Sequence, residues 1–236
     1  MPSRLEPAQI GPAARDAVAE RLAEFGFTAS TDLLERLGKF ATLLALWGSK
    51  LNLTAAPDDP DATAFHIVDS LMPLILATHP ENATLAGMFD SGMRVLDLGS
   101  GAGFPALILA AATHAHFTML EARRKRASFL AVAASEMRLD NIRVDSNYRA
   151  DSDLEPAYDV VTARAFAEPA VAIRTAAAAL KPGGRALLYL SAAQHPEVAA
   201  AIAAAPEFEP PGIVAYELKR RDCAVAHLLA VVRRVG

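Results

Sequence analysis

The stretch that decides the fold is RVLDLGSGAGFP, residues 94–105. Its apolar first half contains one acid, Asp97, and is followed by three alternating glycines. Glycine has no Cβ and tolerates positive φ, so such a turn lets a ligand approach the backbone closely. The helix that we expect after Pro105 adds unpaired N–H groups beside the turn. The pattern predicts a strand, a turn and a helix that bind a small, partly anionic ligand.

The composition is that of a globular protein with ample apolar surface for a core. The 236 residues are 53% hydrophobic and 21% charged, with a formal net charge of −4. This charge predicts no strong nonspecific attraction to nucleic acid, although it is compatible with a local basic face. The single cysteine, Cys223, leaves no internal disulfide or cysteine-based zinc site and favours a reducing compartment. With no signal peptide and no membrane-length apolar stretch, we expect a cytoplasmic monomer without a membrane partner.

Residues 1–85 predict an N-terminal helical subdomain, and residues 86–236 a second domain. The boundary is placed in the irregular stretch that follows the helix expected over residues 60–79. Asp59 and Pro60 are good residues for the N-cap and first position of that helix.

An earlier helix is predicted by apolar residues between Leu33 and Leu51, which recur at alternating spacings of four and three. This periodicity lines one helix face. We interpret the whole stripe, including Trp47, as packing. Thr31 or Asp32 is the expected N-cap.

From residue 93 the pattern changes to apolar strands that alternate with helices. The expected strands are 94–98, 116–121, 142–146, 158–163, 185–190, 212–218 and 225–233, and the expected helices are 105–113, 123–138, 168–180 and 195–205. This rhythm indicates βαβ units and a mostly parallel sheet. Only a charged turn separates the last two strands, so we expect them to form an antiparallel hairpin. By analogy of fold, the sequence predicts an α/β, Rossmann-like, seven-stranded S-adenosylmethionine-dependent methyltransferase with an N-terminal helical subdomain.

A dinucleotide-binding fold begins in the same way, so details must decide the cofactor. Residues 101–106 match the G-x-G-x-x-G/A fingerprint, and Glu121 follows at the end of the next expected strand. However, Asp97 stands where a nicotinamide protein usually has an apolar residue, and Pro105 interrupts the start of the helix. The order D-x-G-x-G-x-G over residues 97–103 resembles methyltransferase motif I. We therefore favour S-adenosylmethionine over a dinucleotide.

In this interpretation several residues contact the cofactor. Glu121 accepts hydrogen bonds from the ribose hydroxyls, with a solvated acid at a strand end as the alternative. The turn containing Gly99 and Gly101 holds the methionine end, and Phe104 packs nearby. Residues 149–151 close the third strand, where this fold commonly contacts adenine, although a plain loop fits equally well.

The residues at the end of the fourth expected strand help to identify the methyl acceptor. Residues 163–166 read ARAF, whereas enzymes that methylate exocyclic amines usually carry an Asn/Asp-Pro-Pro-aromatic signature there. The lone Cys223 lies at the distant hairpin, which disfavours pyrimidine-C5 chemistry. The remaining acceptor is one whose lone pair is free without deprotonation, such as guanine N7. That reaction needs alignment and exclusion of water but no general base, so we assign no catalytic residue.

Two basic features accompany this strand end. Arg164 could contact the cofactor carboxylate, guanine O6 or a phosphate, or it could pair with an acid such as Glu168. Residues 123–126 place four cations at a helix N-terminus, against the helix dipole. An external anion such as RNA phosphate would compensate them, with a solvated charged turn as the alternative. Lys125 and Arg126 are therefore candidate substrate contacts.

His66, Asp69 and Ser70 share one face of the helix expected over residues 60–79, away from its apolar stripe. They fit a polar network at the domain junction or substrate contacts equally well, and Asn52 is equally ambiguous. A zinc site would need further ligands that the sequence does not offer, so we expect no metal.

Together these residues resemble one family, the bacterial small-subunit ribosomal RNA guanine-N7 methyltransferases (RsmG, also called GidB). The motifs are, in order, Trp47 with Asn52-Leu53-Thr54, His66-x-x-Asp69-Ser70, residues 97–105, Lys125-Arg126-x-x-Phe129-Leu130 and Arg164-Ala165-Phe166. They span roughly residues 33–190. The resemblance implies transfer of a methyl group from S-adenosylmethionine to guanine N7 in 16S rRNA of the small ribosomal subunit. It also implies cofactor contacts, by position, at Gly99, Phe104, Ala150, Asp151 and Arg164.

The chain departs from the family pattern at several positions. Ala106 stands where the family usually has a glycine, and Phe65 where a basic residue often precedes the histidine. Residues 189–191 replace a lysine-glycine, and one residue is inserted after Ile142. These departures motivate one alternative, an RNA- or ribosome-binding module with a vestigial cofactor pocket. The negative net charge motivates another, a small-molecule methyltransferase.

Overall fold

The computed structural model describes residues 5–148, 151–220 and 223–236. Its strands are β1 (Arg94–Leu98), β2 (His116–Leu120), β3 (Ile142–Asp145), β4 (Tyr158–Arg164), β5 (Leu180–Ser191), β6 (Gly212–Arg220) and β7 (Cys223–Arg233). Its α-helices are α1 (Pro7–Glu24), α2 (Thr31–Leu51), α3 (Pro60–Leu76), α4 (Ala106–Ala112), α5 (Arg124–Glu136), α6 (Pro169–Ala179) and α7 (His195–Ala203). Short 3₁₀ turns are η1 (Pro80–Leu85), η2 (Asp151–Asp153) and η3 (Ala192–Gln194).

The strands form one seven-stranded sheet in the order β3-β2-β1-β4-β5-β7-β6. The first five strands are parallel, whereas β7 pairs antiparallel with both β5 and β6. The expected α/β fold, with its mostly parallel seven-stranded sheet and terminal antiparallel hairpin, is confirmed. The sheet order reverses at β1, which lies between β2 and β4. In open α/β sheets, ligands bind beyond the carboxyl ends of the strands at such a reversal.

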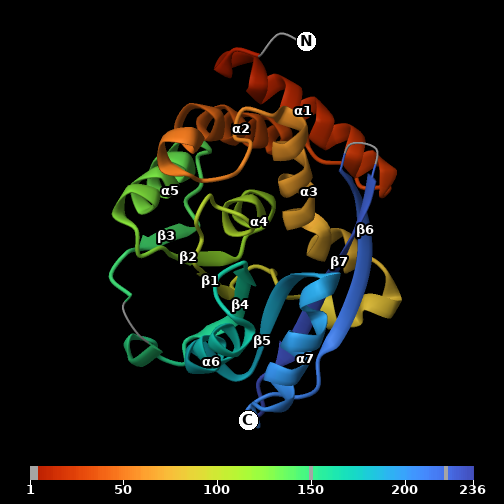
Figure 1. Ribbon diagram of the computed structural model, residues 1–236, viewed down its shortest axis with the longest axis vertical. Helices are drawn as coiled ribbons and strands as arrows, with labels where there is room; N and C mark the ends of the chain where they lie inside the picture. The colour runs from red at the N-terminus through yellow and green to blue at the C-terminus, as the bar shows by residue number, and fades with distance from the viewer. Residues whose placement is uncertain (1–4, 149–150, 221–222) are drawn as a thin grey trace.

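Helices cover both faces of the sheet (Figure 1). Residues of α4 and α5 share one core cluster with residues of α1, α2 and α3. Helices α6 and α7 pack in a second cluster on the opposite face. The first cluster is continuous from the N-terminal helices to the sheet, because Phe40 of α2 and Phe104 after β1 meet edge to face with ring centroids 5.3 Å apart. The division into domains at residue 85 stays a prediction.

Several element boundaries differ from those expected. Strand β5 begins at Leu180 rather than at residue 185, with an irregular register against β4 between Tyr158 and Val160. Helix α3 ends at Leu76 rather than at residue 79. Its N-terminus is as expected, because Oδ1 of Asp59 accepts from the N–H groups of the second and third helical residues.

Helix α2 corrects two expectations. Its N-cap is Ser30, whose Oγ accepts from Leu33 N at 3.2 Å, rather than Thr31 or Asp32. The apolar stripe is buried as far as Leu44, but Trp47 is 38% exposed. The interpretation of Trp47 as core packing is therefore wrong.

The buried face of α2 continues through Gly48 instead of Trp47, because residues four apart stack on one helix face. A Cβ on Gly48 would lie 2.2 Å from Cβ of Pro57, so the following loop packs directly against the helix backbone. A count of apolar residues does not detect a glycine contact of this kind.

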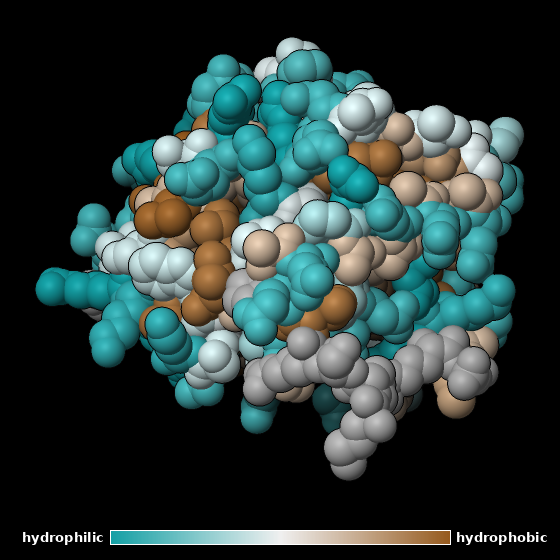
Figure 2. All heavy atoms as spheres, turned by 90° about the horizontal axis from the view of Figure 1, so that it is seen from above, coloured by the Kyte–Doolittle hydropathy of each residue, from teal (hydrophilic) through white to brown (hydrophobic). Residues whose placement is uncertain are grey.

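The face seen from above the N-terminal helices is predominantly hydrophilic, with small separate hydrophobic patches (Figure 2). Leu46 and Trp47 are among the exposed large apolar side chains of the described chain. Within the described ranges, no helix combines the length and the apolar character needed to cross a membrane.

We predict that Gly48→Ala destabilises the protein by about 1–3 kcal/mol, the usual cost of overpacking. Helix propensity alone would raise the free energy of unfolding by about 1 kcal/mol. A decrease would therefore identify the contact with Pro57 as the dominant effect. The measurement is the free energy of unfolding in urea. Ser49→Ala on the exposed side of the same turn is the control and should be neutral or slightly stabilising. A stabilised Gly48→Ala variant would contradict the prediction.

Candidate functional site

The turn after β1 requires glycine. Gly99, Gly101 and Gly103 have φ values of +65°, +53° and +97°, in the left-handed region that favours this residue. Close neighbours add a second constraint: a Cβ on Gly99 would lie 2.6 Å from Cδ2 of Phe166, and one on Gly103 2.3 Å from Cδ1 of Leu107. The turn therefore exposes backbone at the carboxyl end of the central strand.

Glu121, directly after β2, stabilises this turn. Its Oε2 accepts from Gly101 N at 3.0 Å, and its Oε1 accepts from Arg123 N at 2.8 Å. The residue is only 6% exposed, so its interpretation as a solvated acid is wrong. The carboxylate links the glycine turn to the start of α5 and retains further lone pairs on both oxygens.

Asp97 belongs to β1, just before the turn, and is 1% exposed. Oγ1 of Thr162 donates to its Oδ1 at 2.6 Å, whereas its Oδ2 is buried and finds no hydrogen-bond partner in the described chain. Burial raises the pKa of this carboxyl to about 7, against the opposing hydrogen bonds of Ser100 and Thr162. A buried carboxylate oxygen without a partner fits a cationic group of a ligand.

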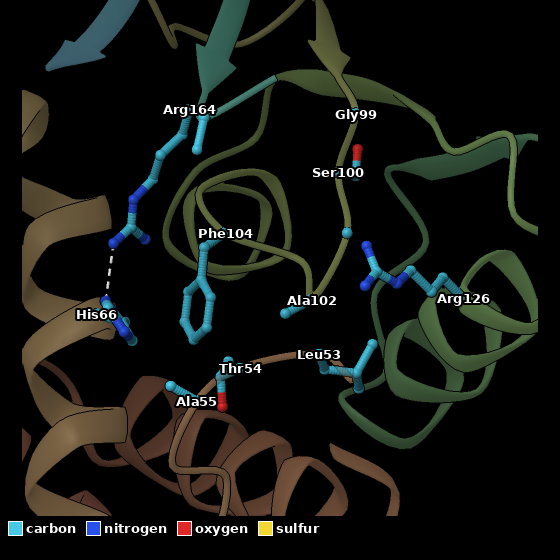
Figure 3. A pocket seen from close by; sticks show the side chains of 12 residues that line it. Leu53, Thr54, Ala55, His66, Gly99, Ser100, Ala102, Phe104, Arg126 and Arg164 are labelled. Atoms are coloured by element: carbon cyan, nitrogen blue, oxygen red, sulfur yellow. Dashed lines mark hydrogen bonds between the residues drawn. The ribbon is translucent and has the colours of Figure 1, made fainter. Parts of the chain in front are cut away.

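A cavity of about 290 Å³ opens beside the turn (Figure 3). Its lining comes from the loop after α2, from α3, from the glycine turn, from α5 and from the tip of β4. These residues are Leu53, Thr54, Ala55, His66, Gly99, Ser100, Gly101, Ala102, Phe104, Arg126, Arg164 and Ala165. Ala165 has φ +52°, a strained conformation for a residue with a Cβ, of a kind that clusters at functional sites.

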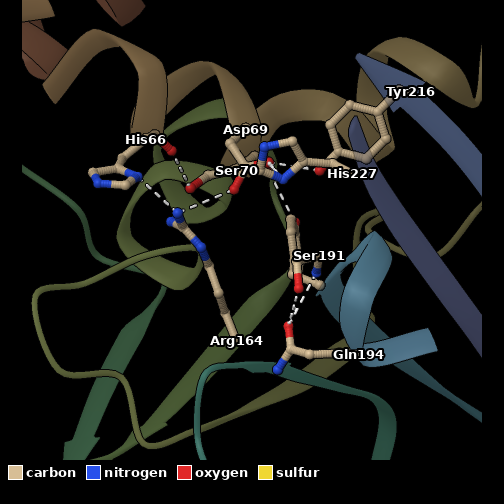
Figure 4. Close-up of polar contacts among 9 residues, drawn as sticks. His66, Asp69, Ser70, Arg164, Ser191, Gln194, Tyr216 and His227 are labelled. Atoms are coloured by element: carbon tan, nitrogen blue, oxygen red, sulfur yellow. Dashed lines mark hydrogen bonds and ion pairs between the residues drawn. The ribbon is translucent and has the colours of Figure 1, made fainter. Parts of the chain in front are cut away.

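Arg164 connects the cavity to the protein interior. Its Nη2 donates to Nδ1 of His66 at 2.7 Å and lies 3.1 Å from Oδ2 of Asp69 (Figure 4). The alternative that Arg164 pairs with an acid is thus confirmed, and the acid is Asp69 rather than Glu168. The guanidinium carbon also lies 5.5 Å from the centroid of the Phe104 ring, a cation–π distance.

Asp69 is the centre of a buried polar cluster. Besides Arg164, it accepts from the Tyr216 hydroxyl at 2.6 Å and lies 3.4 Å from Nδ1 of His227. Both of these residues belong to the terminal hairpin. The Asp69 side chain is 2% exposed, so the carboxylate contributes to the site by holding Arg164 in place.

The predicted residues of α3 therefore occupy different environments. His66 lines the cavity, whereas Ser70 is fully buried. The Ser70 hydroxyl donates to the backbone oxygen of His66, and the Tyr189 hydroxyl donates to the backbone oxygen of Ser70. Burial, and secondarily the Arg164 charge, lower the pKa of His66 to about 3. This imidazole is neutral at physiological pH.

The structure also places the other candidate substrate contacts differently: Asn52, Lys125 and Arg126. Asn52 is exposed and ends α2 in the left-handed conformation, with φ +50°. Its backbone oxygen accepts from Nη2 of Arg126 at 2.6 Å. Arg126 reaches the cavity, whereas Lys125 is exposed outside the lining. This contact joins the N-terminal helices to the basic start of α5.

Asp151 lies in η2 and faces α6. Its carboxylate accepts from the Tyr148 hydroxyl at 2.8 Å, from Oγ1 of Thr175 at 2.7 Å and from Nε of Arg174 at 3.1 Å. It does not line the cavity. Ala150 lies outside the described residues.

The structure also adds residues that sequence reasoning did not single out. Tyr216 and His227 reach Asp69 from the hairpin, and no local pattern indicates them. Phe65, where the family often has a basic residue, has the guanidinium of Arg220 6.0 Å from its ring centroid. The hairpin thus brings a cation to this position. The described chain contains no group of three His, Cys, Asp or Glu side chains that could hold a metal ion.

Solved structures share the fold. An S-adenosylmethionine-dependent O-methyltransferase from Thermotoga maritima aligns with a TM-score of 0.52 and 16% identity. The alignment covers 72% of this chain and 65% of that one, so the chain spans slightly less than two thirds of this neighbour. At this identity the likeness concerns the fold alone.

Sequence relatives are more specific. The protein named ribosomal RNA small subunit methyltransferase G of Sorangium cellulosum (strain So ce56) is 33% identical over 191 residues, covering 79% of this chain and 76% of the relative. The protein of the same name from Neisseria gonorrhoeae (strain NCCP11945) is 35% identical over 164 residues, covering 69% and 73%. The GidB family, described as rRNA small subunit methyltransferase G, matches residues 33–207. The chain belongs to this methyltransferase family.

Proposed function

We propose that this protein transfers the methyl group of S-adenosylmethionine to N7 of a guanine in 16S rRNA of the small ribosomal subunit, as a cytoplasmic monomer. The observation that carries the choice of N7 is the lack of a poised base among the described lining residues. Arg126 and Arg164 are cations, and the acceptor nitrogen of neutral His66 is occupied by Arg164. Guanine N7 has a free lone pair and no proton to remove, so it suits such a site.

The buried acids support the choice of cofactor. The partnerless Oδ2 of Asp97 would accept the amino group of S-adenosylmethionine, and Glu121 would accept its ribose hydroxyls. The backbone around Gly99 and Gly101 would hold the methionine end, with Phe104 beside it. When bound, the cofactor supplies an electrophilic methyl group on a sulfonium. By the family resemblance, Ala150 and Asp151 would lie near the adenine.

The basic start of α5 supports binding of RNA. Arg123, Arg124 and Lys125 are exposed, and Arg126 extends from the same turn into the cavity. Phosphates near these cations would hold the RNA in register, while the cavity aligns one base and excludes water. We propose Asn52, His66, Lys125 and Arg126 as substrate contacts, with Asp69 and Ser70 acting behind them.

The direct test is to incubate the protein with S-adenosylmethionine and unmethylated bacterial small subunits, and to analyse the nucleosides by mass spectrometry. We expect N7-methylguanosine at one position of 16S rRNA, and none when the protein or the cofactor is omitted. Binding of subunits without methylation would instead indicate a vestigial cofactor pocket. Methylation of a small molecule but not of RNA would indicate the other alternative.

The pKa of Asp97 generates a pH prediction. Because its folded pKa of about 7 lies above the usual value of 3.8, folding binds a proton, and stability from this group falls as pH rises between these values. Asp97→Asn should therefore raise the melting temperature of the cofactor-free protein progressively more from pH 5 to about pH 7, above which the difference levels off. The same variant should weaken cofactor binding about 10–100-fold at pH 8, since a charged partner is lost.

The measurements are thermal unfolding and titration calorimetry with S-adenosylmethionine. The wild type should bind the cofactor more tightly at pH 8 than at pH 6, because binding selects the ionised carboxyl. Asp140→Asn, an exposed acid remote from the cavity, should change neither quantity. A cofactor affinity unaffected by Asp97→Asn would remove Asp97 from the proposed site.

Arg164 should have separable effects on stability and on activity. Arg164→Ala leaves the buried charge of Asp69 without its ion-pair partner, which costs about 3–5 kcal/mol. Adding Asp69→Asn removes that charge and should restore most of the free energy of unfolding. Methyl transfer should stay at least about 100-fold reduced in both variants, because the group beside the cavity is still absent. If activity returned together with stability, Arg164 would have only a structural role.

A further inference from the structure

The hydrogen bond between Arg164 and His66 determines which ring nitrogen of His66 carries a proton. A guanidinium has only donors, and its Nη2 lies 2.7 Å from Nδ1 of His66. Nδ1 must therefore be the acceptor, which leaves the proton of the neutral imidazole on Nε2. Among the described residues, His66 makes no other side-chain hydrogen bond. The Nε2–H group is thus available to the cavity that the ring lines (Figure 3).

Two aromatic rings lie close to the ring of His66, in addition to Arg164. Its centroid lies 5.4 Å from that of Phe104 and 5.6 Å from that of Phe65. Burial and the Arg164 charge keep the imidazole neutral, with its pKa lowered to about 3. The side chain therefore presents one uncharged donor in a fixed direction, and little entropy is lost when a partner accepts from it.

Arg164 itself has less to offer a base. Its Nη2 already donates to His66 and forms the ion pair with Asp69. Paired recognition of guanine by arginine also engages N7 together with O6, and a hydrogen bond to N7 would occupy the lone pair that must attack the methyl group. A donor that helps N7 methylation must therefore bind beside N7 and leave N7 free.

Guanine has one acceptor that meets this condition. On the same base edge, O6 lies next to N7 and accepts hydrogen bonds, whereas adenine carries an amino donor in that place. An uncharged donor is also favourable, because the purine gains positive charge as N7 is methylated. We propose that His66 Nε2–H donates to O6 of the target guanine and so makes His66 a residue that determines specificity; this rests on the function proposed above.

The test is a double-mutant cycle that combines one protein variant with one base change in the 16S rRNA. His66→Asn retains an acceptor near the position of Nδ1 but has no group at the position of Nε2. Small subunits are reconstituted with 16S rRNA that carries, at the guanine found by the mapping experiment, either guanine or 2-aminopurine. The second base keeps N7 and the 2-amino group but lacks O6. The quantity measured is kcat/KM for methyl transfer to each subunit.

We expect 2-aminopurine to lower kcat/KM of the wild type about 10–100-fold, the discrimination given by a good base contact. In His66→Asn the ratio of kcat/KM for guanine to kcat/KM for 2-aminopurine should fall. It should come within about threefold of the ratio of the reactivities of the two bases toward dimethyl sulfate. His66→Gln, whose amide nitrogen can reach the position of Nε2, should recover part of the discrimination. Calorimetry should give nearly unchanged cofactor affinity for both variants.

Each other outcome is decisive. If His66→Asn lowers kcat/KM for both bases by the same factor, the effects of the variant and of the base change are independent, and His66 does not contact O6. If the variants lose cofactor affinity in proportion to activity, His66 serves the cofactor and the inference is wrong. If the wild type forms no N7-methylguanosine on subunits that contain guanine, the proposed function itself fails, and the inference with it.

Discussion

The ion pair between Asp69 and Arg164 is the interaction on which the site depends. A carboxylate that is 2% exposed would be strongly unfavourable alone, because removing a charge from water costs several kcal/mol. Here it has an arginine partner at 3.1 Å and a tyrosine donor at 2.6 Å. The pair joins α3 to the tip of β4, and Tyr216 joins both to the hairpin. The orientation of the Arg164 guanidinium, and through it of the His66 ring, follows from this cluster.

The parts of the fold that sequence alone predicted are those encoded by neighbouring residues. The run through Asp97 predicted a strand that the structure places at residues 94–98, and Asp59 with Pro60 predicted the start of α3. The terminal hairpin was predicted because only a short charged turn separates its strands. In each case, periodicity, capping or glycine conformation within about ten residues carries the information.

The remaining features depend on contacts between distant parts of the chain. Asp69 and Tyr216 are 147 positions apart, so no spacing rule indicates that one accepts from the other. Trp47 follows a periodic apolar stripe yet is 38% exposed, because the loop at Pro57 packs on Gly48 instead. For His66, the sequence offered a histidine on a polar helix face, and only the approach of Arg164 determines its tautomer.

The hairpin at the end of the chain has a consequence for the order of synthesis. The glycine turn, Glu121 and Arg164 have all been translated before β6 and β7, yet β7 inserts between β5 and β6 and completes the sheet. Until Tyr216 arrives, Asp69 lacks a donor that its burial requires. A nascent chain can therefore form the cofactor turn first, whereas the ordered acceptor side requires β6 and β7, which are synthesised later. Ordering of the Arg164 side of the site is in this way coupled to synthesis of the last two strands of the sheet.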